Sequence, residues 1–270
     1  GDRTMIDFNQ ANDILLKYLR VKTQPLSVKF INNVSEIPEG VMRPSTFKAK
    51  MALCQINTIA RKWNMALAVT PEEVNCAAAL LAFGWGDLGD LNREEELVNF
   101  MVSAGYISDV DKARSSLKEQ AFFSGQKKFD SKGLIVAPIN AGVIKEPDVI
   151  LIYGNPAQIA RLIQSMIYVE GGAIESRAHL GLSCIGEMIE PVISKKAMYI
   201  VPGRGERQIG MAADDEMAFT LPSAKLQNLL TGLKETDGKG TRYPIQPFLF
   251  FEPRFNKAVS QLVKKINVTD

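Results

Sequence analysis

Two segments of the chain follow the same order of elements, and this apparent repeat constrains the fold more than any other feature. Pro25–Ile31 and Pro147–Tyr153 each open with a proline that leads into a largely apolar run of strand length. A helix-like pattern, a short strand-like run and a cysteine follow each of them. We predict an α+β or α/β protein with a mixed sheet, flanking helices and two pseudo-symmetric halves. Chance similarity between two strand–helix–strand units is the alternative.

The halves are expected to span residues 1–132 and 133–270, each with a strand–helix–strand–helix unit, in one compact globular unit. A chain of 270 residues with 46% hydrophobic residues can bury a large core. Thr70 either begins a helix or starts a single turn, after which Asn75 caps a separate helix from Cys76. The other elements are predicted from periodicity: strands at 26–31, 66–69, 133–138, 148–153, 173–176, 197–201, 218–221 and 248–251, and helices at 6–18, 48–62, 92–119 with a break near 105, 156–168, from 184 onward, 222–233 and 256–266.

The charge pattern excludes several classes of protein. The chain has 32 basic and 30 acidic residues, scattered among one another, with a net charge of only +2, so no nucleic-acid partner is expected. The apolar runs 133–137 and 149–153 are far shorter than the ~20 residues that cross a bilayer, so no membrane span is expected. Residues 1–5 lack an apolar signal core, which predicts a cytoplasmic protein unless a signal was removed before Gly1. A small-molecule or cofactor ligand and a homo-oligomer remain open.

The three cysteines are the best functional lead. Their wide spacing and odd number argue against a secreted disulfide framework. Cys76 and Cys184 follow Asn75 and Ser183, which are good helix caps, so both thiols are predicted at a helix opening, where the helix dipole favours a thiolate. They also lie at matching positions of the apparent repeat, and Cys54 lies on a neighbouring predicted helix.

Three thiolates suit an iron–sulfur cluster with one open iron, or a soft metal ion, so Cys54, Cys76 and Cys184 are the predicted metal ligands. The alternative is that all three are buried and pack as small hydrophobic residues.

Four further residues are candidate cofactor contacts. Arg204 and Arg207 lie in a glycine-containing stretch that could offer guanidinium groups and amides to an anion, although an ordinary connecting loop is the alternative. Glu216 closes a run of three acidic residues and is the most plausible contact among them. His179 is the one histidine, which excludes any mechanism that needs two, and it is either the partner of a nucleophilic Cys184 or a surface residue.

Several of these stretches together resemble the domain of unknown function 169 family, which is widespread in archaea and anaerobic bacteria. The matching pieces include Pro25–Phe30, Ile37–Gly40, Pro147–Pro156 and Gly203–Pro222, together with the three cysteines. The chain departs from the family pattern after Cys76, where three alanines replace a glycine-rich turn. The resemblance covers most of the chain and implies no activity.

The preferred hypothesis is a cytoplasmic cofactor- or metal-binding protein of anaerobic metabolism, with a cysteine-lined site between its two halves. A small-molecule or protein-interaction module with purely structural cysteines is one alternative. An anion-binding enzyme that uses Arg204 and Arg207 is the other. The sequence leaves open whether the protein is an enzyme.

Overall fold

One antiparallel sheet organises the protein. The computed structural model describes residues 7–86, 92–119, 131–176, 178, 183–245 and 255–266. Within these ranges six strands pair in the order β2-β3-β1-β4-β6-β5, and every named strand pair is antiparallel. The α+β class is therefore confirmed. The strands are β1 (Leu26–Ile31), β2 (Leu67–Val69), β3 (Gly133–Pro138), β4 (Val149–Gly154), β5 (Met198–Ile200) and β6 (Met217–Pro222).

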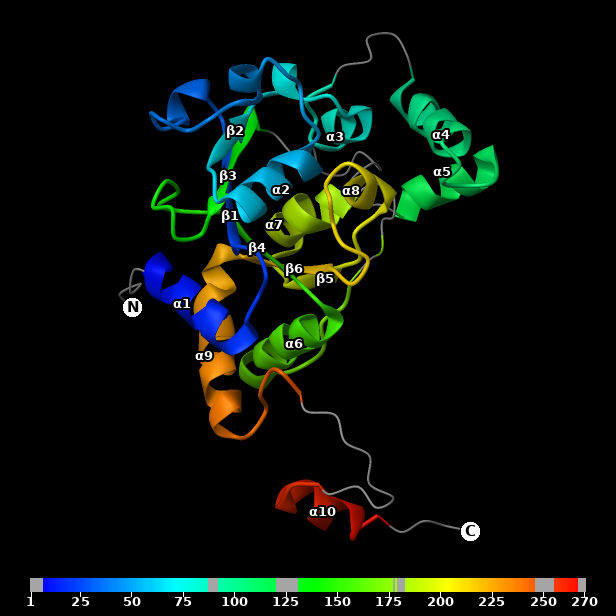
Figure 1. The fold of residues 1–270 in the computed structure, drawn as a ribbon. Coiled ribbons are helices and arrows are strands. Elements are labelled where there is room, and N and C mark those ends of the chain that lie inside the picture. The colour runs from blue at the N-terminus through cyan, green and yellow to red at the C-terminus, as the bar shows by residue number, and fades with distance from the viewer. Residues whose placement is uncertain are drawn as a thin grey trace.

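Helices cover both faces of the sheet (Figure 1). One face carries α1 (Phe8–Leu19), α6 (Pro156–Glu170) and α9 (Leu226–Gly238). The other carries α2 (Leu53–Trp63), α3 (Ala77–Ala82), the π-helix η4 (Ile185–Ile189), α7 (Glu190–Ser194) and α8 (Arg204–Gln208). The remaining helices are α4 (Arg93–Ser103), α5 (Val110–Glu119) and α10 (Lys257–Val263), and short 3₁₀ turns lie at Val34–Glu36, Pro44–Phe47, Pro71–Glu73 and Ser223–Lys225.

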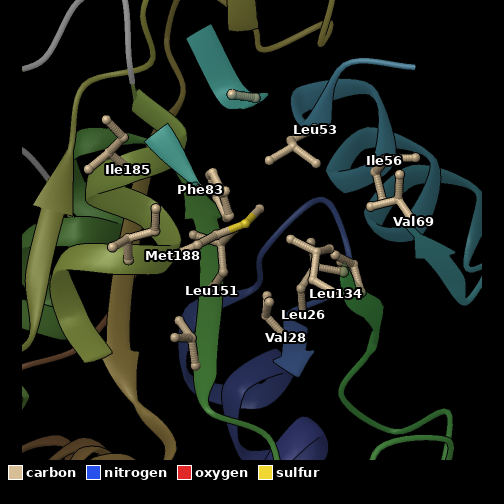
Figure 2. Packing of buried hydrophobic residues seen from close by; sticks show 14 of the residues in the cluster. Leu26, Val28, Leu53, Ile56, Val69, Phe83, Leu134, Leu151, Ile185 and Met188 are labelled. Carbon is tan, nitrogen blue, oxygen red and sulfur yellow. The ribbon is translucent and has the colours of Figure 1, made fainter. Parts of the chain in front are cut away.

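Alternation along β4 divides the core between the two faces. Ile150 and Ile152 pack with α1, α6 and α9, whereas Val149, Leu151 and Tyr153 pack on the opposite face. This period of two is the expected geometry of a strand buried on both sides. Figure 2 shows the second face, where Leu151 lies between side chains of α2 and those of the π-helix, such as Met188.

The sheet order shows a symmetry between two strand sets. Read outward from its centre, the sheet runs β1, β3, β2 on one side and β4, β6, β5 on the other. Because β1 and β4 are adjacent and antiparallel, a two-fold axis perpendicular to the sheet relates the two sets and keeps equivalent helices on one face. Strand β3 therefore pairs with the strands of the first half, although it begins at residue 133.

The helices before β2 and β5 are equivalent under this symmetry, and they change the register of the predicted repeat. Both end at a left-handed residue, Asn64 or Lys195, three residues before the strand begins. When residues are counted back from Asn64 and Lys195, the position equivalent to Cys184 is Cys54, not Cys76. The second helix contains one more residue over this stretch. A π-helical turn accommodates one extra residue, and η4 is such a turn.

Most predicted elements are confirmed, and the differences have local causes. The helix predicted over 48–62 begins at Leu53, because Lys48 adopts a left-handed conformation that ends the preceding 3₁₀ turn. Pro71–Glu73 forms a single turn, and Cys76 itself occupies the N-cap of α3. The stretch predicted as a loop at 203–207 is the short helix α8, and 173–176 is not a strand. The strand predicted at 248–251 lies outside the described residues.

Candidate functional site

The three cysteines line a single cavity of about 260 Å³. Cys54 is at the start of α2, Cys76 caps α3, and Cys184 begins the helix that continues as η4. The symmetry explains part of this convergence, because it brings the N-terminal ends of two equivalent helices toward one another. The rest of the wall is mostly apolar or carboxylic: Ala52, Leu53, Ala77, Ala78, Ala79, Phe100, Tyr106, Ser183, Glu187, Gly205, Glu206 and Ile209.

Two carboxyl groups and a tyrosine form a buried hydrogen-bonded cluster at this wall. The Tyr153 hydroxyl lies 2.5 Å from Oε1 of Glu206 and 3.0 Å from Oε1 of Glu187. The Asn57 amide donates to Oε2 of Glu187 at 3.3 Å. Glu187 comes one turn after Cys184 on the same helix, and Glu206 lies on α8, so both reach the cavity that the thiols line. We call Tyr153, Glu187 and Glu206 the acid cluster.

The acid cluster holds a proton on Glu187 at neutral pH. Burial raises the pKa of Glu187 well above its usual range, and the charge of Glu206 beside it raises the pKa further. Burial also raises the pKa of Tyr153, so this group stays a neutral phenol. Two carboxyl groups in contact cannot both ionise without strong repulsion. Glu187 and Glu206 therefore form an acid–carboxylate pair, in which the Glu187 carboxyl donates to Glu206.

A buried ion pair between Arg61 and Glu216 packs against Tyr153 of the acid cluster. The guanidinium of Arg61 lies 3.9 Å from the centre of the Tyr153 ring and donates to both carboxylate oxygens of Glu216, at 2.6 and 3.0 Å. The pairing with Arg61 lowers the pKa of Glu216 despite its burial. Asn57 and Arg61 lie four residues apart on α2, which places them on one face of the helix. Cys54 lies on the same face of α2 and lines the cavity.

Burial favours the protonated form of two of the thiols, Cys54 and Cys184. Burial, followed by the charge of Glu206, raises the pKa of Cys54 to about 12. Burial and the neighbouring Cys76 raise the pKa of Cys184 well above its usual value. The helix dipole, which predicted thiolates, is outweighed by loss of water and by two nearby carboxyl groups. The three cysteines are close enough that ionisation of one thiol disfavours ionisation of another, and none forms a disulfide.

The predicted three-thiolate metal centre finds no support. Across the described ranges, no group of three histidine, cysteine, aspartate or glutamate side chains is arranged to hold a metal ion. Cys54, Cys76 and Cys184 lie on three separate elements and share one cavity wall. The three cysteines do share one cavity, and metal ligation by them stays a prediction.

Of the four predicted cofactor contacts, Arg204, Arg207 and Glu216 do not line the cavity, and the fourth lies outside the described residues. Arg204 donates to the carbonyl of Ala104, and Arg207 donates to backbone carbonyls of Pro202, Ala213 and Glu216. These guanidinium groups therefore bind the protein's own backbone. Glu216 is committed to Arg61, as described above. His179 lies outside the described residues.

Five residues of the site were not predicted from the sequence: Asn57, Arg61, Tyr153, Glu187 and Glu206. The signal was the presence of polar residues on apolar faces: Asn57 and Arg61 interrupt the buried stripe of α2, and Glu187 stands within a buried helical run. Tyr153 closes a strand whose other residues are apolar or glycine. A buried polar side chain requires a partner, so such residues point toward one another. Their pairing depends on the sheet order, which the sequence does not state.

Comparison with known proteins identifies the family. The chain belongs to DUF169, described as "Uncharacterised ArCR, COG2043", whose sequence profile matches residues 14–232. It is similar to "Uncharacterized protein MJ0308" of Methanocaldococcus jannaschii, with 21% identity over 229 residues that cover 82% of this chain and 91% of that protein. No solved structure matches. The resemblance predicted from the sequence is confirmed, and it assigns no activity.

Among the helices that the structure describes, none has both the length and the apolar character to cross a membrane.

Proposed function

We propose that the protein binds a small molecule in the cavity between its two symmetry-related halves. The observation that carries this proposal is the convergence of Cys54, Cys76 and Cys184, from three separate elements, on one cavity that also exposes the acid cluster. Protein interiors are close-packed, and a cavity lined by ionisable groups is expensive unless it is used. At about 260 Å³ it lies just below the ~300–1,000 Å³ typical of ligand pockets, which favours a ligand of few atoms.

A fragment screen by ligand-observed NMR tests the proposal. Ala77 lines the cavity at its exposed rim, so Ala77→Trp fills the entrance without replacing a core side chain. Ala49 is also exposed but does not line the cavity, and Ala49→Trp is the matched control. Fragments should bind the wild type and Ala49→Trp and lose binding in Ala77→Trp. The proposal would be contradicted if no fragment bound the wild type, or if the fragments bound Ala77→Trp as tightly as the wild type.

A soft metal ion is the second candidate, favoured only by the mutual proximity of the three thiols. It requires the cysteines to move and lose their protons on binding. Cadmium titration would show an ultraviolet thiolate-to-metal absorption band if this happens, and no band at equimolar Cd²⁺ would remove the candidate. Three unpaired cysteines near one another suit a reducing compartment, and we propose the cytoplasm as the location.

A further inference from the structure

Among the described residues, the walls of the cavity carry acidic groups and no basic side chain. Its ionisable lining side chains are the three thiols, Tyr106, Glu187 and Glu206, and no lysine, arginine or histidine is among the described residues that line it. The Cys54 and Cys184 thiols and the Glu187 carboxyl hold their protons, as shown above. The charge that the described residues present to the cavity is therefore negative and is concentrated on the acid–carboxylate pair.

Glu206 is a buried carboxylate with one oxygen that lacks a hydrogen-bond partner among the described residues. Its side chain lines the cavity, and the residue is only 4% exposed. Oε1 accepts from Tyr153, but Oε2 accepts no hydrogen bond from an N–H or hydroxyl group in the parts of the chain that the structure describes. The nearby guanidinium of Arg61 is bound to Glu216, so it does not neutralise this carboxylate with an ion pair. A buried carboxylate with spare acceptor capacity favours a ligand that brings positive charge.

Aromatic rings complete the cavity on the side of α4. Phe100 lies on α4 and Tyr106 just after it, and both line the cavity with ring centres 5.9 Å apart. Aromatic faces attract cations, and several rings together recognise alkylated ammonium groups. Neutral thiols and alanines supply the remaining polarisable, weakly polar surface. Anionic ligands are disfavoured by the same features.

We infer that the ligand of this cavity is a small organic cation of the alkylammonium class, with its charge against Glu206 and its alkyl groups against Phe100, Tyr106 and the thiols. This inference rests on the proposed function, because it presumes that the cavity binds a small molecule. The limited volume restricts the class to cations of a few carbon atoms.

The test compares charged and neutral probes of one shape. Choline and 3,3-dimethylbutan-1-ol differ only in whether the central atom of the trimethyl group is a charged nitrogen or a carbon. A calorimetric series of methylammonium, trimethylammonium, tetramethylammonium and choline, with the alcohol as control, should show binding of at least one alkylammonium ion. Choline should bind at least tenfold more tightly than the neutral alcohol.

Two variants separate charge from shape. Glu206→Gln keeps the size of the side chain and removes its charge, so cation binding should weaken at least tenfold while binding of the neutral alcohol is unchanged. Glu235→Gln alters an exposed carboxylate on α9, on the opposite face of the sheet, and should have no effect. Phe100→Leu, at a side chain that is 38% exposed, provides a second variant that is expected to fold and should weaken cation binding severalfold.

The outcomes distinguish this inference from the proposal that it rests on. Equal binding of choline and the neutral alcohol, or full cation binding in Glu206→Gln, would overturn the choice of a cation. Failure of every ammonium ion, alongside neutral fragments that lose binding in Ala77→Trp, would also overturn it and leave the proposed function standing. Failure of both probe sets would overturn both.

Discussion

Glu187 couples the stability of the protein to pH. The folded protein keeps a proton on this carboxyl, whereas the unfolded chain releases it near the ordinary carboxyl pKa. The unfolded state therefore binds fewer protons above that pKa, and stability falls as pH rises toward the raised folded pKa. One proton corresponds to about 1.4 kcal/mol per pH unit. Glu187→Gln, which cannot ionise, should flatten the slope by about this amount in urea unfolding between pH 5.5 and 7.5. An unchanged slope would show that the carboxyl is ionised in the fold.

Arg61 is the residue on which the buried polar region depends. Arg61→Met leaves Glu216, a largely buried carboxylate, without its bidentate partner, and removes the cation over the Tyr153 ring. Breaking a buried pair on one side typically costs about 3–5 kcal/mol. We expect a loss of this order in the free energy of unfolding, partly recovered in Arg61→Met/Glu216→Gln, where the orphaned charge is gone.

The matched control is an exposed ion pair. Lys22 lies 3.6 Å from Asp215, and both side chains are more than half exposed. Exposed pairs contribute at most about 1 kcal/mol, so Lys22→Met should be nearly silent. A similar loss in both variants would mean that the Arg61 pair is solvated rather than buried.

At the scale of elements, the close crossing of α6 and α9 depends on one glycine. A Cβ added at Gly232 would lie 2.0 Å from the carbonyl oxygen of Ser165, whereas one at Gly238, near the end of the same helix, would meet nothing within 4 Å. Gly232→Ala should force the helices apart and cost at least ~2 kcal/mol. Gly238→Ala should be neutral, or stabilise by up to ~1 kcal/mol through helix propensity. Thermal unfolding of the two variants tests this, and equal melting temperatures would contradict the crossing.

Most elements could be predicted because periodicity and caps are local signals. The helix at Pro156 has Asn155 as its cap and proline in its first turn, and all six strands of the sheet lie at expected positions. The start of α2 could not be placed, since a left-handed Lys48 has no clear local signature. The register of the repeat failed because the prediction matched α2 with α6, whereas the helix that ends before β5 is the equivalent of α2, and residues 173–176 form no strand.

At the scale of the whole molecule, the sequence predicted where chemistry would concentrate but not what arrangement it would take. The cysteines were expected between the halves, and all three do line one cavity there. Whether a thiol at a helix opening is ionised depends on its burial and on which charges face it from other elements. Glu187 and Glu206 lie on two separate elements, η4 and α8, and both line the cavity, a convergence that depends on tertiary packing.

Cys54, Cys76 and Cys184 share one cavity, in which burial and a neighbouring carboxyl pair raise the pKa of the Cys54 and Cys184 thiols. Residue-resolved alkylation by iodoacetamide at pH 7.5, read by mass spectrometry, tests it most directly. Cys54 and Cys184 should react at least tenfold more slowly in the folded protein than in urea, because only thiolates react. Ala77→Trp should slow all three cysteines together, and Ala49→Trp should slow none. Folded-state reaction at the rate of the unfolded chain, or protection of only one cysteine by Ala77→Trp, would contradict the account.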